Sequence, residues 1–272
     1  MSQQVETRSR NAVLVEDAAL IRMMGMPVLE SVPSRRVPYE LTDPFILVHE
    51  GRFSPSEMAG KDTKHPHRGF DNIWYVLKGS ASTGHTTGPG GSIERAHLSE
   101  GSLLWLRTGR GAWHAEGIGA EEVAEGHGDT EFRSVLFWVN LARKDKHAEP
   151  RAHVLHRDQI AMRKEGDATV RVLAGEGSPV QLGTPALILD VELPDGGRIT
   201  TPVPPDFQGF AYLLEGEAAF GANKRQARPP QLVLLGPGEE LAVTDAAPGT
   251  RFMLMAGKPY GEAPIFNGPF VD

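Results

Sequence analysis

The sequence predicts an all-β protein made of two similar sandwich or barrel domains in tandem, with little helix. Gly 31 and Pro 21 together approach a fifth of the 272 residues, which suits many short strands joined by tight turns. Short apolar runs bounded by turn residues recur along the chain, whereas helical periodicity is scarce. One segment of the first half also has a recognisable counterpart in the second half.

The expected strands follow one another at short intervals. In the first half they are DPFILVHEG (43–51), NIWYVLKGSAS (72–82), GSLLWLRTG (101–109) and RSVLFWVNLA (133–142). In the second half they are ALILDVELPDGG (186–197), FAYLLEGEAAFG (210–221), QLVLLGPG (231–238) and RFMLMAG (251–257). Runs of this length and spacing are typical of sandwiches and barrels.

Two segments differ from this pattern. HRDQIAMRKEGDATV (156–170) could hold one short helix before its glycine, Gly166. GIGAEEVAEGHGDTE (117–131) is acidic and rich in glycine, and we expect a mobile surface loop there.

The repeat pairs GFDNIWYVLKGSA, from Gly69, with GFAYLLEGEA, from Gly209. Each is followed by a glycine beside a leucine-rich strand, EGSLLWL in the first half and QLVLLGPGEEL in the second. The polar segment ARKDKHAEPRAH (142–153) lies between the copies. We therefore predict an N-terminal domain over residues 1–145 and a C-terminal domain over residues 146–272.

The two copies differ in histidine. His65, Pro66, His67 and Arg68 stand just before Gly69, whereas the segment PDFQ (205–208) stands just before Gly209. All ten histidines lie at or before His156. The sequence therefore predicts that only the first domain can bind a metal through nitrogen, and that the second is structural.

Composition excludes several classes of function. The formal charge of -7 argues against direct nucleic-acid binding, because a phosphate backbone needs a basic face. No run of eighteen apolar residues could span a membrane, and the N-terminus is a poor secretory signal. The sequence contains no cysteine, which rules out thiolate nucleophiles and cysteine metal sites. We expect a cytoplasmic protein.

Two pairs of candidate ligands share one spacing. His65 and His67 stand two residues apart, as do His114 and Glu116 in GRGAWHAEG. Side chains at i and i+2 of a strand point to the same face, so two such pairs on neighbouring strands can converge on one point. A histidine pair alone is more often an incidental surface pair. Its combination with the second pair, and the loss of histidine in the duplicate, favours a metal site.

Three imidazoles and one carboxylate suit a divalent transition metal, and softness alone allows Fe, Mn, Ni, Cu or Zn. Four protein ligands on an octahedral ion leave two positions for water or substrate. Such an open site indicates chemistry rather than a structural role.

The motifs HPHRGFDNIWYVLKG, GRGAWHAEG and LFWVNLARKDK, with the ending AGKPYGEAPIFNGPF, resemble the pirin family of the cupin superfamily. The resemblance runs from about residue 43 to the C-terminus. It implies two cupin domains with a single metal in the first. The family's ligands fall on the four residues of the two pairs, and Fe(II) is the implied metal.

The resemblance also implies two alternative functions. Some members are flavonol (quercetin-type) 2,3-dioxygenases that use O₂, which predicts a small aromatic substrate. Glu116 would then act as ligand and as catalytic base, because it is the ionisable ligand able to loosen and take a proton. Other members are redox-sensing or metal-dependent partners of regulatory proteins. For that role the acidic segment near Glu121 and Glu122 is a candidate contact.

Four further residues are candidates for positions around the metal or the pocket. Asp71 stands where pirins usually carry glutamate, so any contact it makes with the site would be rearranged or bridged by water. His49 stands where they carry an acidic residue; it could be a base at the pocket rim, an extra ligand or, as we favour, a surface residue. Arg68 could hold an anionic substrate, but an ion pair with Asp71 is favoured. Trp113 could line an aromatic pocket or, like other strand aromatics, belong to the core.

Overall fold

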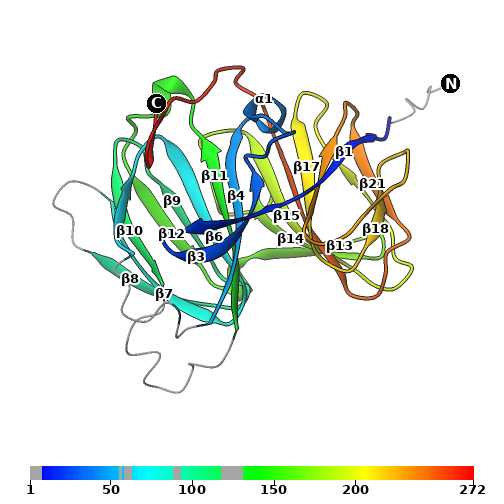
Figure 1. Cartoon of the computed structure of the whole chain (residues 1–272), viewed down its shortest axis with the longest axis horizontal. Helices are drawn as coiled ribbons and strands as arrows, with labels where there is room; N and C mark the ends of the chain where they lie inside the picture. The colour runs from blue at the N-terminus through cyan, green and yellow to red at the C-terminus, as the bar shows by residue number, and fades with distance from the viewer. Residues whose placement is uncertain (1–7, 55–56, 58–62, 88–92, 118–130) are drawn as a thin grey trace.

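The computed structural model describes residues 8–54, 57, 63–87, 93–117 and 131–272, without the side chains of residues 116 and 117. It consists almost entirely of strands, as predicted. The described helical segments are single turns: α1 (Tyr39–Thr42), η2 (Arg143–Asp145) and η3 (Arg157–Gln159). Figure 1 shows two β sandwiches side by side, each made of a large sheet and a small one.

The N-terminal sandwich pairs a seven-stranded sheet with a four-stranded one. The large sheet contains, in spatial order, β12 (Arg151–Leu155), β9 (Leu103–Arg107), β6 (Phe70–Lys78), β11 (Phe132–Asn140), β4 (Phe45–Phe53), β3 (Met26–Val32) and β2 (Ala19–Met23). The small sheet contains β5 (His65–His67), β10 (Ala112–Gly117), β7 (Ser80–Thr86) and β8 (Glu94–Ser99).

The C-terminal sandwich repeats this plan. Its large sheet has the order β1 (Ala12–Asp17), β20 (Gln231–Leu235), β17 (Gln208–Glu215), β22 (Thr250–Gly257), β15 (Ala186–Leu193), β14 (Ala168–Ala174) and β13 (Ala161–Glu165). Its small sheet has the order β16 (Ile199–Pro202), β21 (Glu240–Thr244), β18 (Ala218–Phe220) and β19 (Arg225–Ala227). A short hairpin, β23 (Phe266–Asn267) and β24 (Phe270–Val271), follows near the chain end.

Position by position, the two sandwiches correspond strand for strand. The repeated motifs that begin at Gly69 and Gly209 lie in β6 and β17, the third strand of each large sheet. At one end of each large sheet, β1 pairs with β20 of the second sandwich, and β12 pairs with β9 of the first. With the predicted division after residue 145, each of these strands belongs to the half of the chain that forms the other sandwich, so the two strands are exchanged. The domain boundary between residues 145 and 146 stays a prediction.

The segment 156–170 is not the short helix that the sequence suggested. After the single turn η3 it forms β13, which pairs with β14 from Ala161↔Val172 to Glu165↔Ala168. Gly166, at φ +59°, provides the tight turn of this hairpin. Pairing with a neighbouring strand therefore overrides the local helical signal.

The two large sheets pack face to face through one apolar core. Aromatic and aliphatic residues of both domains form it, among them Tyr75 and Phe137 from the first and Tyr212 and Met253 from the second. All four are fully buried. Burial of this kind supplies most of the free energy that joins two such domains.

A buried polar triad crosses this interface. The Tyr75 hydroxyl, on β6, donates to Asp190 Oδ2, on β15, at 2.8 Å, and Arg251 Nε, on β22, donates to Asp190 Oδ1 at 2.8 Å. Asp190 has no exposed surface. Burial and then the Asp190 charge raise the pKa of Tyr75, so the phenol stays protonated and acts as a donor.

A second triad has the same arrangement with the roles of the two domains exchanged. The Tyr212 hydroxyl, on β17, donates to Glu50 Oε2, on β4, at 2.7 Å, and Arg133 Nε, on β11, donates to Glu50 Oε1 at 2.6 Å. The tyrosines and the carboxylates thus occupy equivalent strands of the two domains. The reciprocal arrangement fixes how one sheet registers on the other.

The interiors of the two sandwiches differ. In the second, Ile199, Leu241 and Val243 of the small sheet are buried against the large sheet within one continuous core. In the first, the corresponding apolar cluster is much smaller. By strand order the counterpart of β5 is β16, not the segment just before Gly209 that the sequence spacing suggested. Buried Ile199 and Thr201 therefore stand in the strand equivalent to the one that carries His65 and His67.

Candidate metal centre

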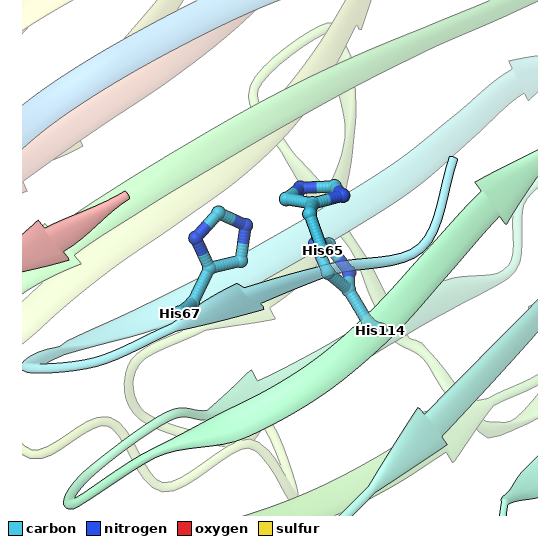
Figure 2. A group of neighbouring side chains, drawn as sticks. All are labelled: His65, His67 and His114. Carbon is cyan, nitrogen blue, oxygen red and sulfur yellow. The ribbon is translucent and has the colours of Figure 1, made fainter. Parts of the chain in front are cut away.

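Three histidines converge inside the N-terminal sandwich. His65 and His67 come from β5, and His114 comes from the neighbouring strand β10, where it lies directly opposite His65. One nitrogen from each ring lies within 4.8 Å of the others. Figure 2 shows the three rings gathered on one side of the two strands. The predicted convergence of the two histidine motifs is therefore present.

Backbone carbonyls fix the protonation of two of the rings. His65 Nδ1 donates to the Thr63 carbonyl at 2.6 Å, and His67 Nδ1 donates to the Pro269 carbonyl at 3.2 Å. Each ring therefore keeps an unprotonated Nε2, which is the form that binds a metal. The amide nitrogen of Asn72 lies 3.4 Å from His114 Nδ1 and helps to position the third ring.

The nitrogen spacing fits a bound cation. His65 Nε2 and His114 Nε2 are 3.0 Å apart. Two imidazole nitrogens bound at right angles, each about 2.1 Å from a metal ion, lie roughly 3.0 Å from each other. The donor set of three neutral imidazoles thus suits a divalent transition metal.

Burial keeps the His67 and His114 rings neutral. Loss of solvation, followed by the nearby His65, lowers the pKa of His67 to about 3. Loss of solvation likewise lowers the pKa of His114 well below its ordinary value, with smaller contributions from the other two rings. At neutral pH both side chains therefore offer lone pairs without first releasing a proton.

Glu116, the predicted fourth ligand, belongs to β10 and has Thr83 as its Cα partner on β7. Its side chain lies outside the described part of the chain, as do Glu121 and Glu122. The roles assigned to these residues from the sequence stay predictions.

An apolar cavity adjoins the histidines. Apolar side chains make up most of its lining and polar groups are few, which is typical of small-molecule sites. His65 and His67 form one wall, and Trp74, Leu136 and Trp138 of the large sheet form another. Methionines of the β2–β3 hairpin line it as well: Met23, Met24 and Met26. Flexible thioether side chains allow such a wall to adapt to a ligand.

Comparison with known proteins decides the family. Residues 28–139 match the family model described as Pirin, and residues 188–272 match the one described as Pirin C-terminal cupin domain. A pirin-like protein from Solanum lycopersicum is 35% identical over 263 residues, which cover 94% of this chain and 81% of that protein. The chain belongs to the pirin family. The prediction of two cupin-type domains is confirmed.

Solved structures share this pirin fold. A quercetin 2,3-dioxygenase from Acinetobacter baumannii is 23% identical with a TM-score of 0.82, and the match covers 96% of this chain and 91% of that one. A bacterial pirin from Escherichia coli in complex with nickel(II) is 12% identical with a TM-score of 0.66, covering 90% and 99%. Among the described residues of this pirin, no helix is long and apolar enough to cross a membrane.

His49 is not the surface residue that the sequence favoured. It is 3% exposed, lines the cavity, and its Nε2 lies 2.8 Å from Glu30 Oε2 on the neighbouring strand. The residue faces inward because β4 pairs with β3 and β11 at the centre of the large sheet. Of its three predicted roles, the structure is compatible with those inside the pocket.

The predicted ion pair between Arg68 and Asp71 is wrong. Asp71 is fully buried, and it accepts from Trp105 Nε1 at 3.1 Å and from Arg107 Nε at 3.0 Å. It also accepts from the backbone of Gly183 at 2.6 Å, so this carboxylate joins the two domains instead of contacting the histidines. Asp71 is the second residue of the buried strand β6, whereas Arg68 precedes the turn at Gly69 and donates to Asp272.

Neither of the two roles predicted for Trp113 is found. Trp113 is 46% exposed and packs under the Lys64 ammonium, so it belongs neither to the cavity nor to the core. It stands next to inward-facing His114, and adjacent residues of a strand face opposite sides. His85 is a further buried histidine: it is 4% exposed and lies opposite His114 on β7.

Sequence reasoning missed Trp138 and Asn72. The Trp138 ring lies 4.8 Å from the His67 ring, and Asn72 contacts His114. Both stand on the inner face of the large sheet, where β11 and β6 pair them directly. Their sequence signal is weak, because a strand that is buried on both faces shows no clear alternation.

The end of the chain returns to the metal centre. We call residues 258–272 the C-terminal strap. Its Pro269 carbonyl accepts from His67 Nδ1. Both carboxylate oxygens of Asp272 accept from Arg68 Nη2, the shorter contact being 2.6 Å. Lys146 Nζ donates to the Val271 carbonyl at 3.2 Å and to the Gly69 carbonyl at 3.0 Å. The strap therefore supports one candidate ligand from behind.

Changing Gly69 to alanine should weaken metal binding. Gly69 has φ +90°, and a Cβ there would overlap the Val271 carbonyl oxygen. The strap must then move, and Pro269 moves away from His67. Loss of a partner that orients a ligand reduces metal affinity by about tenfold or more, which a competition titration with a chromophoric chelator would measure.

Gly196→Ala is the matched control for this prediction. Gly196 also has a positive φ, +66°, but no atom lies within 4 Å of its Cβ position. Both variants suffer the same backbone strain of roughly 1 kcal/mol. Equal metal affinities in the two variants would contradict a role of the strap in orienting His67.

Lys146 should make stability depend on pH in the alkaline range. Burial lowers its pKa from 10.5 to about 8. Between these values the unfolded chain still holds a proton that the folded chain has released, so stability rises with pH. Relative to Lys146→Met, the wild-type free energy of unfolding should increase by about 2 kcal/mol between roughly pH 7.5 and pH 9.5, as measured in urea. A constant difference over this range would contradict the prediction.

Proposed function

We propose that this pirin is a mononuclear metal dioxygenase that acts on a flavonol-like, quercetin-type aromatic substrate with O₂. One observation carries the proposal: three clustered imidazoles, two of which line an apolar cavity, lie in the first domain, whereas the equivalent interior of the second domain is packed with aliphatic side chains. The similarity of the fold to a quercetin 2,3-dioxygenase supports the reaction class.

His65, His67 and His114 would hold the metal, with Glu116 as the fourth ligand. Fe(II) is our first choice. Ni, Mn, Cu and Zn remain compatible with the donor set, and an E. coli pirin was solved with nickel(II). When bound, the metal would supply Lewis-acid chemistry that lowers the pKa of a substrate hydroxyl and aligns the reacting partners.

The protein's own side chains would do the rest. Trp138 and Leu136 would hold the aromatic plane and exclude water from the site. We assign the proton of the substrate hydroxyl to the Glu116 carboxylate, as an ionisable group two residues after His114. The carbonyl partners of His65 and His67 would keep these rings in the ligating form.

Oxygen uptake tests the proposal. Metal-free protein would be loaded anaerobically with Fe(II), and in parallel with Ni, Mn, Cu or Zn, and then mixed with quercetin and oxygenated buffer. We expect uptake of one O₂ for each quercetin consumed. No uptake with any of the metals would refute the dioxygenase. A Glu116→Ala variant with a lower melting temperature but unchanged uptake would instead indicate that this carboxylate only braces the domain.

A second candidate is a redox-sensing regulator that binds a protein partner. It is favoured by the hydrogen bond between His67 and the C-terminal strap, which connects the candidate metal centre to the end of the chain. Oxidation of iron adds one positive charge beside this contact and could alter the strap. Hydrogen exchange of residues 258–272 should then differ between Fe(II) and Fe(III) protein; equal exchange would remove this candidate.

A further inference from the structure

The cavity beside the metal centre contains two polar atoms that the protein leaves unused. His49 Nδ1 and Trp138 Nε1 are buried and have no hydrogen-bond partner within the described part of the chain. Both residues line the cavity, whose walls are otherwise largely apolar. Because a buried polar group without a partner costs free energy, such atoms in a cavity indicate a ligand that supplies the missing bonds.

The sheet register places these atoms near the histidines. On β11, Leu136 pairs with His49 on one side and with Trp74 on the other, and Trp138 follows two residues later on the same face. The Trp138 ring contacts the His67 ring at 4.8 Å. One inner face of the large sheet thus carries His49, Trp138 and the contact to a candidate ligand.

Glu30 determines which ring atom of His49 faces the ligand. Its Oε2 lies 2.8 Å from His49 Nε2, and the two residues are directly opposite on β3 and β4. A carboxylate accepts, so Nε2 carries the proton and donates to it. In the neutral ring Nδ1 is then an acceptor, while the Trp138 indole can only donate.

We infer that His49, oriented by Glu30, is a specificity-determining residue that accepts a hydrogen bond from a hydroxyl group of an aromatic ligand at the metal centre. Trp138 Nε1 donates to an oxygen of the same ligand. The apolar walls hold the rings, and this acceptor and donor distinguish a hydroxylated ligand from its unsubstituted parent. The inference rests on the proposed function for the place of the ligand, but not on its turnover.

Binding of two matched probes tests the inference without any turnover. Quercetin and flavone, which shares its ring system but has no hydroxyl groups, would be titrated anaerobically into metal-loaded protein. Trp74 and Trp138 line the cavity, so quenching of tryptophan fluorescence would report binding. Wild type should prefer quercetin, and His49→Leu should weaken quercetin binding about tenfold while leaving flavone binding unchanged.

Two further variants keep the test decisive. Glu30→Leu removes the acceptor that holds the proton on His49 Nε2, so Nδ1 is no longer fixed as an acceptor; it should reduce the preference for quercetin even if His49→Leu folds poorly. His153→Leu, at an exposed histidine on β12, should change neither affinity. Metal content and melting temperature would be measured for every variant.

The outcomes separate this inference from the proposed function. Equal losses for both probes in His49→Leu, no loss for either, or failure of quercetin to bind the wild type would each overturn the inference. Quercetin binding that depends on His49, without oxygen uptake, would sustain it and remove the dioxygenase. Oxygen uptake that is unchanged in His49→Leu would support the dioxygenase and overturn the inference about His49.

Discussion

Protein carrying His114→Ala should be purified almost without metal. His114 provides one of three clustered nitrogens, lies 3.0 Å from its partner His65, and is 1% exposed. Two histidines from the short strand β5 would remain, and the lost imidazole would be replaced by a buried methyl group. We expect metal content to fall from about one ion per chain to below a tenth, as measured by inductively coupled plasma mass spectrometry on untagged protein.

His114→Ala should also lose the thermal stabilisation that bound metal gives to the wild-type protein. Wild-type protein should melt at a higher temperature with excess Fe(II) or Ni(II) than after chelation, because ligand binding to the folded state stabilises it. The melting temperature of His114→Ala should not respond to metal. His153→Ala, which removes an exposed histidine, should behave as wild type. Retention of a full complement of metal by His114→Ala would refute the assigned site.

Asp190→Ala should be the most destabilising change at the domain interface. Asp190 is fully buried, and it accepts from Tyr75 at 2.8 Å and from Arg251 at 2.8 Å and 2.7 Å. Its removal leaves a guanidinium largely buried without its main counter-ion. Breaking such a pair costs about 3–5 kcal/mol, which equilibrium unfolding in guanidinium chloride would reveal as a lower midpoint.

Two variants with smaller expected losses of unfolding free energy serve as references for Asp190→Ala. Tyr75→Phe removes a single hydrogen bond to the same carboxylate and should cost about 1 kcal/mol. Glu192→Ala removes the partly exposed carboxylate that also contacts Arg171, at 2.8 Å, and should cost less than about 1 kcal/mol. A loss for Asp190→Ala no larger than that for Glu192→Ala would show that the buried triad does not hold the domains together.

Much of the fold could be predicted because its signals are local. Short apolar runs mark the strands, and the motifs that begin at Gly69 and Gly209 mark equivalent strands, β6 and β17, in the two copies. The convergence of His65, His67 and His114 follows from the spacing of two residues within strands that pair. Absence of histidine from the second copy likewise predicted a structural role, and the interior of that copy is packed with apolar side chains.

What could not be predicted depends on contacts between distant parts of the chain. Arg68 finds its partner at Asp272, and Asp71 finds Arg107 and Gly183. Neither pairing leaves a trace in the local sequence. His49 sits in a strand buried on both faces, so its alternation gives no indication of which side it faces.

The exchange of β1 and β12 between the two sheets has a consequence for the history of the molecule. A fragment ending at residue 145 would lack β12 and leave β9 as a bare edge, open to aggregation, and the remaining fragment would lack β1 beside β20. With this division, the large sheet of each half is therefore completed by a strand from the other half of the chain. Selection for folding alone can thus retain a domain that has no histidine, because removing it would expose an unpaired strand edge in the domain that contains His65, His67 and His114.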